Sequence, residues 1–151
     1  MFSTIMVALD GSQVAERALE SATFLAKLSG AKIVLVRNQD VPESIVENPA
    51  KFPVIYEIFE KEGQEGQHYL DRHASAIRES GLEVTTLLLH GASAAESIRT
   101  AAEQQMADLI VLTSHGRSGV SRFLLGSVAE KLARLAPCPV MIVGRPTLSP
   151  P

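Results

Sequence analysis

Residues 113–127 read TSHGRSGVSRFLLGS, a stretch rich in glycine and serine that connects two contrasting patterns. Before it stands the apolar run Asp108–Thr113, which has the length and composition of a buried strand. After it, apolar residues recur at helical spacing, at Leu125, Val128, Leu132 and Leu135. Strand, glycine-containing loop and helix in this order are typical of an α/β fold, in which the start of such a helix favours an anion.

Apolar runs of strand length recur along the chain and alternate with helical patterns. The runs are Thr4–Leu9, Ala31–Val36, Leu82–Leu89, Asp108–Thr113 and Val140–Val143. Runs that are apolar throughout, without alternation, indicate strands that are buried on both faces of a sheet. Right-handed crossovers between them predict a single doubly wound α/β domain, with a parallel sheet and helices on both faces.

Four helices are expected between these strands. The first follows residues 10–12 and ends at Gly30, which suits a helix C-cap. The second spans about Glu57 to Ser80, and the third begins at the capping-box sequence Ser93–Glu96. The fourth is the C-terminal helix described above.

The stretch Asp40–Tyr56 contains three prolines and is predicted as a long connection without regular structure. Connections of this length are often lids or binding surfaces, so the stretch closes over a ligand, docks a partner or is a mobile insert. The sequence predicts one domain over residues 1–146 and a frayed tail over residues 147–151.

Length and composition narrow the class of protein. The 151 residues suffice for one domain, and 46% hydrophobic with 21% charged residues is ordinary for a globular chain. A net charge of -3 and only 5% aromatic residues argue against a nucleic-acid partner. The single cysteine, Cys138, lies between two prolines and is expected to be a small buried apolar residue. With no signal-peptide pattern and no apolar stretch of ~20 residues, the sequence predicts a cytoplasmic protein without a membrane segment.

The carboxyl ends of the strands are where a doubly wound sheet binds its ligands. Asp10 follows the first strand, and it either binds a phosphate-bound Mg²⁺ or a ribose hydroxyl, or forms an Asx turn. Gly116 and Gly119 allow the backbone to approach a ligand, and Arg117 between them adds positive charge. Ser127–Glu130 has the form of a capping box, so helix capping and phosphate binding both fit the sequence there.

Two common nucleotide-binding motifs are absent from the sequence, the P-loop G-x-x-x-x-G-K-[ST] and a G-x-G-x-x-G after the first strand. A Ser-His-Asp hydrolase is disfavoured as well, because Ser114 and His115 are adjacent and no G-x-S-x-G motif accompanies them. The other histidines lack metal-ligand spacing. The sequence therefore predicts anion binding after the fourth strand, with Asp10 as the candidate metal ligand.

Five segments of the chain carry a pattern shared with known proteins: Val7–Ser12, Ala107–Leu112, Ser114–Gly119, Leu124–Lys131 and Pro137–Val140. Together they resemble the universal stress protein family, and the resemblance covers nearly the whole chain. The resemblance implies a five-stranded parallel sheet of order 3-2-1-4-5 and a homodimer. In the members that bind ATP, it also implies the motif G-x2-G-x9-G-[ST].

This glycine motif maps onto the chain with one substitution. Gly116 takes the place of the second glycine, nine residues separate it from Gly126, and Ser127 fills the last position. Thr113 replaces the first glycine, which we expect to modify the site without abolishing it. The resemblance implies that the phosphates are held by backbone N–H groups around Gly116, Arg117, Ser127 and Val128.

The same resemblance assigns residues to the rest of the nucleotide. Asp10 corresponds to the acidic residue near the nucleotide, with Ala8 beside it at the strand end. Asn38, after the second strand, takes the position whose backbone meets adenine, where the family often has valine. Leu112 would pack on the nucleoside.

The resulting hypothesis is a cytoplasmic stress-response protein that binds ATP with Mg²⁺ and acts as a dimeric signalling or protective factor. Binding is favoured over fast hydrolysis because no general base is evident. The apolar edge strand Val140–Val143 is expected to pair with its copy and form the homodimer. Two alternatives are a nucleotide-free dimeric interaction module, which Thr113 favours, and a slow ATPase; a further protein partner fits any of the three.

Overall fold

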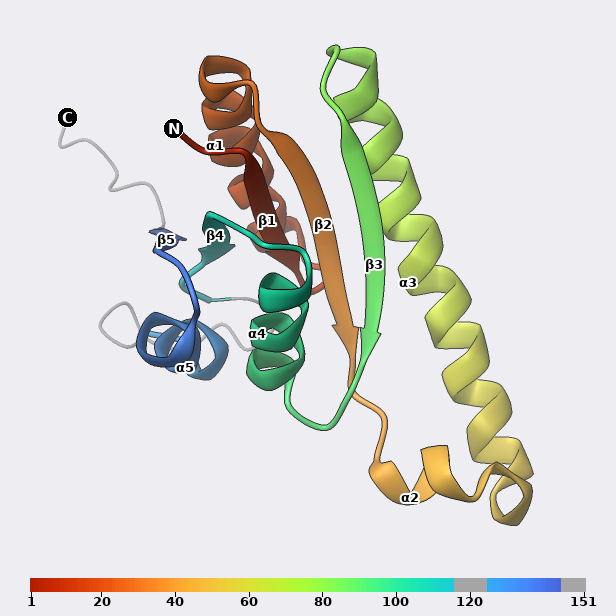
Figure 1. Cartoon of the computed structure of the whole chain (residues 1–151). Coiled ribbons are helices and arrows are strands. Elements are labelled where there is room, and N and C mark those ends of the chain that lie inside the picture. The colour runs from red at the N-terminus through yellow and green to blue at the C-terminus, as the bar shows by residue number, and fades with distance from the viewer. Residues whose placement is uncertain (116–124, 145–151) are drawn as a thin grey trace, which may run out of the picture.

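The computed structural model of the chain describes residues 1–115 and 125–144. Within these residues, five parallel strands form one sheet in the order β3-β2-β1-β4-β5 (Figure 1). The strands are β1 (Thr4–Leu9), β2 (Lys32–Gln39), β3 (Val84–His90), β4 (Leu109–Thr113) and β5 (Val140–Val143). The α/β fold and the strand order expected from the sequence are confirmed.

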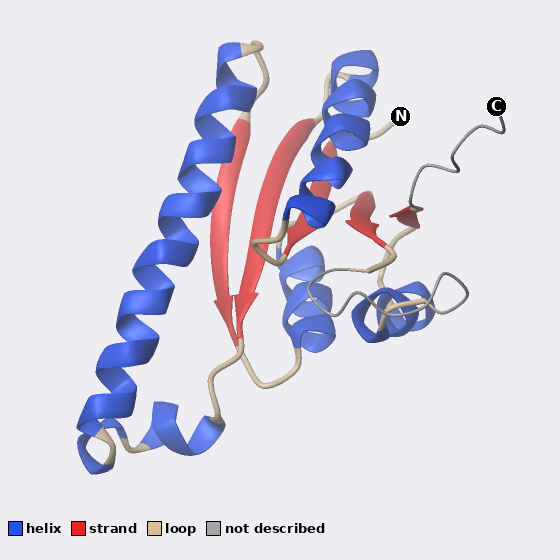
Figure 2. Cartoon of the chain, turned by 180° about the vertical axis from the view of Figure 1, so that it is seen from behind, coloured by secondary structure: helices blue, strands red, loops and turns tan. Residues whose placement is uncertain are grey.

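Helices cover both faces of the sheet (Figure 2). They are α1 (Gln13–Ser29) and α3 (Pro53–Glu79) on one face, and α4 (Ala94–Gln104) and α5 (Ser127–Leu135) on the other. Successive residues of β1 therefore serve two separate cores. Ile5 and Val7 pack toward α1 and α3, whereas Met6 and Ala8 pack toward α4 and α5. This division explains why β1 is buried at all six positions and apolar at all of them except Thr4.

The two helices that flank the carboxyl end of β1 leave the sheet on opposite faces. β1 continues into α1, and its neighbour β4 is followed by α5 on the other face. Because these two helices lie on opposite faces, a crevice opens at the carboxyl ends of the central strands. Doubly wound sheets place their ligands in such a crevice.

The stretch Asp40–Tyr56, which we expected to be an irregular connection, contains helical structure. It forms α2 (Glu43–Glu47), a 3-10 turn at Pro49–Lys51 and the first turn of α3, which begins at Pro53 and not near Glu57. The prolines suggested a break, but Pro49 and Pro53 stand at the first helical positions, where a missing N–H has no cost. Figure 1 shows α2 and the start of α3 extending beyond the sheet.

Two smaller expectations also differ from the structure. The strand expected to end at Val36 continues to Gln39, so Asn38 lies within β2 and not after it. Cys138 is half-buried, not buried. Desolvation of its thiol, the largest effect, raises the pKa of Cys138.

Among the helices of the described residues, not even the 27-residue α3 has an apolar stretch long enough to cross a membrane.

Candidate functional site

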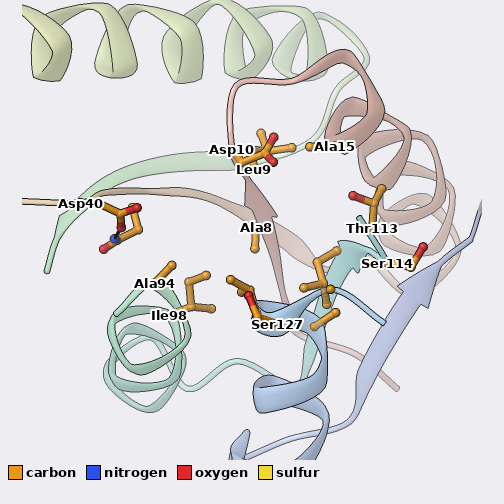
Figure 3. A pocket seen from close by; sticks show the side chains of 15 residues that line it. Ala8, Leu9, Asp10, Ala15, Asp40, Ala94, Ile98, Thr113, Ser114 and Ser127 are labelled. Atoms are coloured by element: carbon orange, nitrogen blue, oxygen red, sulfur yellow. Dashed lines mark hydrogen bonds between the residues drawn. The ribbon is translucent and has the colours of Figure 1, made fainter. Parts of the chain in front are cut away.

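A cavity of about 340 Å³ occupies the crevice at the carboxyl ends of β1, β2 and β4 (Figure 3). The starts of α1, α4 and α5 complete its wall. The lining residues are Ala8, Leu9, Asp10, Ala15, Asn38, Asp40, Ala94, Ile98, Leu112, Thr113, Ser114, Gly126, Ser127, Val128 and Ala129. The lining thus combines apolar side chains with six polar residues, which are Asp10, Asn38, Asp40, Thr113, Ser114 and Ser127.

Asp10 sits at the margin formed by the loop between β1 and α1. Its Oδ1 accepts hydrogen bonds from the backbone N–H of Ser12 at 2.9 Å and from the Ser12 hydroxyl at 2.6 Å. The first contact is the Asx turn that the sequence left open as one interpretation. Ser12 also caps α1, since its Oγ accepts from the N–H of Ala15 at 3.2 Å. The Asx turn and the cap together fix the direction of the Asp10 side chain.

Packing from the opposite face of the sheet holds the same loop in place. Gly11 has a φ of +86°, and a methyl group added there would lie 2.9 Å from Nη1 of Arg37. The Arg37 guanidinium in turn lies 5.3 Å from the centroid of the Tyr69 ring. Burial raises the pKa of Tyr69, and the nearby carboxylates of Glu16 and Asp10 raise it further. Tyr69 therefore stays neutral while Arg37 supports the loop from behind.

The N-terminus of α5 forms the opposite margin of the cavity. Its N-cap is Gly126, which has no side chain to accept from the first N–H groups of the helix. One of the two interpretations that the sequence left open made Ser127 the N-cap of a capping box; Ser127 is instead the first helical residue. Ser12 and Ser93, by contrast, cap α1 and α4 with their hydroxyls. Of these three helices, α5 alone has no side-chain cap, and residues 126–129 line the cavity.

Gly126 is held tightly against the end of β4. Its N–H donates to the carbonyl of Ser114 at 2.7 Å, and a Cβ at Gly126 would lie 2.6 Å from the same oxygen. A side chain at this position is therefore incompatible with the observed approach of the two segments. The glycine lets α5 begin directly beside the strand end.

Thr113 stands where the family motif has its first glycine. It is 9% exposed, lines the cavity and donates its hydroxyl hydrogen to the carbonyl of His115 at 3.0 Å. The side chain is thus partly engaged with its own loop. His115 is equally buried, and its Nδ1 lies 3.2 Å from the Ser114 hydroxyl.

Asn38 and Asp40 form the third polar margin, at the end of β2. Nδ2 of Asn38 donates to Oδ1 of Asp40 at 2.7 Å and to the carbonyl of Gly91 at 3.0 Å. Figure 3 shows Asp40 on the side of Ala94, away from Thr113 and Ser114. The cavity therefore has an acidic end and an end formed by backbone N–H groups.

The structure brings together most of the residues expected from the sequence. Those that line the cavity are Ala8, Asp10, Asn38, Leu112, Thr113, Gly126, Ser127 and Val128. Gly116, Arg117 and Gly119 lie outside the described residues, as does the tail 147–151. The sequence did not point to Asp40, Ser114, Ala94 or Ile98, which line the cavity too. Asp40 follows three polar residues at the end of β2, Arg37, Asn38 and Gln39. Because the strand was expected to end at Val36, this signal was missed.

Comparison with known proteins identifies the family. The model of the universal stress protein family matches residues 1–144. The chain belongs to this family. A universal stress protein of Methanocaldococcus jannaschii is 35% identical over 148 residues, which cover 97% of this chain and 84% of that protein.

Solved structures of this family have the same fold. The structure of hypothetical protein MJ0577 superposes with a TM-score of 0.83 at 26% identity and covers 97% of this chain and 99% of its own. A universal stress protein of Archaeoglobus fulgidus, solved in complex with dAMP, gives a TM-score of 0.63 at 27% identity. That match covers 93% of this chain and 96% of the other.

Proposed function

We propose that this universal stress protein binds ATP with Mg²⁺ in the crevice at the carboxyl ends of β1, β2 and β4. The observation that carries the proposal is the N-terminus of α5, which has no side-chain cap and lines the cavity. Its first N–H groups and the helix dipole suit a phosphate group. The adenine nucleotide in the related Archaeoglobus fulgidus structure supports the same ligand class.

The arrangement of the cavity favours one orientation of the bound nucleotide. Phosphates belong at Ser127 and Val128, where the N–H groups point, and away from the carboxylate of Asp40. Ala8, Ile98 and Leu112 also line the cavity and offer an apolar slot for the base. We propose that the ribose crosses the middle of the cavity, with Thr113 near it.

Mg²⁺ fits this arrangement with Asp10 as its protein ligand. No group of three or more His, Cys, Asp or Glu side chains within residues 1–115 and 125–144 forms a metal cage. Mg²⁺ is commonly held by one or two carboxylates together with substrate phosphates and water. Asp10, fixed by its contacts with Ser12, would supply such a carboxylate.

We propose that the nucleotide-bound protein acts in the cytoplasm as a homodimer in signalling or protection during stress. The dimer would form through the exposed edge of β5, where Met141 is 38% exposed. Thr113 favours a second candidate, a nucleotide-free interaction module, because its Cβ and hydroxyl replace a glycine. Its hydrogen bond to the carbonyl of His115 supports the ATP-binding proposal instead, since this contact turns the hydroxyl toward the loop.

Substitution of Ser127 by proline tests the phosphate site by removing a single N–H group. Proline is well tolerated at the first helical position, and Gly126, with φ -60° and ψ 151°, already has the backbone conformation that precedes proline. Ser127→Pro is expected to retain the fold but to weaken ATP binding by about 10- to 100-fold, measured by titration calorimetry.

Ser127→Ala is the matched control, because it removes only the hydroxyl. The loss of ATP affinity in Ser127→Pro beyond that in Ser127→Ala measures the contribution of the N–H group alone. Equal affinities of the two variants would show that the start of α5 does not hold the phosphates. A native chain that binds no ATP at all would favour the nucleotide-free module.

A further inference from the structure

Asp40 is an exposed residue at the rim of the cavity, and its carboxylate accepts a hydrogen bond there. Its Oδ1 accepts from Nδ2 of Asn38, which donates its second hydrogen to the carbonyl of Gly91. Both hydrogens of the amide are therefore used. Rotating the amide by 180° would turn its oxygen toward two acceptors, so the amide orientation is fixed. Asn38 thus positions Asp40, and Asp40 in turn lines the cavity.

This rim lies where β2 extends past β1. The register pairs Leu9, the last residue of β1, with Arg37, so that Asn38 and the residues after it have no partner in β1. The apolar wall next to Asp40 is formed by Ala94 and Ile98 (Figure 3). A flat base that enters this wall from the side of α5 presents its outer edge to Asp40.

We propose that Asp40, positioned by Asn38, selects the base of the bound nucleotide. This inference rests on the proposed function. An ionised carboxylate only accepts hydrogen bonds. Asp40 therefore stabilises an exocyclic amino group, as in adenine, through a charge-assisted hydrogen bond. It repels a keto oxygen at the same ring position, as in hypoxanthine, because two acceptors would then face each other.

The test compares the affinities of the chain for ATP and for inosine triphosphate, both with Mg²⁺, by titration calorimetry. These nucleotides differ at the ring position that Asp40 is proposed to contact. The native chain is expected to prefer ATP by about tenfold or more, since a hydrogen bond to a charged group is involved. In Asp40→Asn, the amide can rotate and donate to the keto oxygen, so the two affinities are expected to agree within about threefold.

Two further variants separate base selection from general charge. Glu43→Gln removes one negative charge from an exposed position in α2 outside the cavity, so it should retain the preference for ATP. Asn38→Ala releases Asp40 and should lower the preference for ATP. A preference that is unchanged in Asn38→Ala would overturn the positioning role.

The outcomes also separate this inference from the proposed function. Equal binding of both nucleotides by the native chain would overturn the inference and leave the ATP site in place. If Asp40→Asn changes the ratio of ATP to dATP affinity but not that of ATP to inosine triphosphate, Asp40 contacts ribose and the inference is wrong. Binding of neither nucleotide would overturn both.

Discussion

Replacing Gly126 by alanine puts a methyl group against a backbone carbonyl. The added Cβ would lie 2.6 Å from the oxygen of Ser114, whereas a carbon–oxygen contact ordinarily needs about 3.3 Å. The two segments must therefore separate by roughly 0.7 Å at this contact. Ser114 cannot easily give way, because its own N–H is tied to the carbonyl of Val143 at 3.2 Å. The start of α5 is the part that moves.

The cost of this movement follows from the contacts that it disturbs. The hydrogen bond from the N–H of Gly126 to Ser114 lengthens, at about 1 kcal/mol, and crowding adds about 1–3 kcal/mol. We expect Gly126→Ala to lose about 2–4 kcal/mol of the free energy of unfolding. For a chain of 151 residues this corresponds to a fall of about 5–15 °C in Tm. Displaced N–H groups should weaken ATP binding by at least about tenfold.

Thermal unfolding by circular dichroism, without and with ATP and Mg²⁺, measures both effects on the same sample. Gly144→Ala is the matched control, because no described atom lies within 4 Å of a Cβ added there. The control should melt and bind like the native chain. If Gly126→Ala also did so, the close approach of α5 to β4 would not constrain this position, and the phosphate site built on it would be refuted.

Two further predictions concern the edge of the sheet and the start of β1. The carbonyl of Pro139 accepts from Ile110 in β4 and that of Val143 from Ser114 just after it, so the N–H of Ile142 points to the open edge. If the proposed dimer forms through this edge, Ile142→Pro should give a folded monomer in sedimentation; an intact dimer would place the interface elsewhere. Asp108 accepts from two backbone N–H groups at the start of β1, and these bonds lower its pKa. The stabilisation of the fold by these hydrogen bonds is complete above the pKa of an unfolded aspartate and is lost as the pH falls through the lowered pKa of Asp108. Asp108→Asn should therefore reduce Tm at pH 7 but not in strong acid. An equal reduction of Tm at both pH values would refute this prediction.

The fold could be predicted from the sequence because strands that are buried on both faces of a sheet are continuous apolar runs. The residues of β1 pack into two cores, so all of them except Thr4 are apolar, and the strand does not alternate between polar and apolar residues. The helix expected from the capping sequence at Ser93 also proved correct, with Ser93 capping α4. The order of the strands came from the family resemblance, since spacing alone does not say which strands are neighbours.

The errors arose where one residue type serves two structural roles. A proline breaks a helix in its interior but suits its first position, so the start of α3 at Pro53 was placed in a loop. Polar residues end most strands, yet Asn38 and Gln39 continue β2 because its neighbour β3 extends as far, to His90. This pairing depends on residues some fifty positions away in the sequence, and the contribution of Asp40 to the cavity depends on it too.

The capping of the helices around the cavity connects stability with ligand binding. Serine at an N-cap stabilises a helix by about 1 kcal/mol relative to residues that cannot cap it, and α1 and α4 use Ser12 and Ser93 in this way. α5 has Gly126 at its N-cap, although Ser127 is the next residue and a helix beginning there would have a capping hydroxyl. The close contact of Gly126 with Ser114 sets the N-cap one residue earlier. With Gly126 at the N-cap, no side chain caps the N–H groups of Ser127 and Val128, and these are the groups that we propose bind a phosphate where the helix gives up a serine cap.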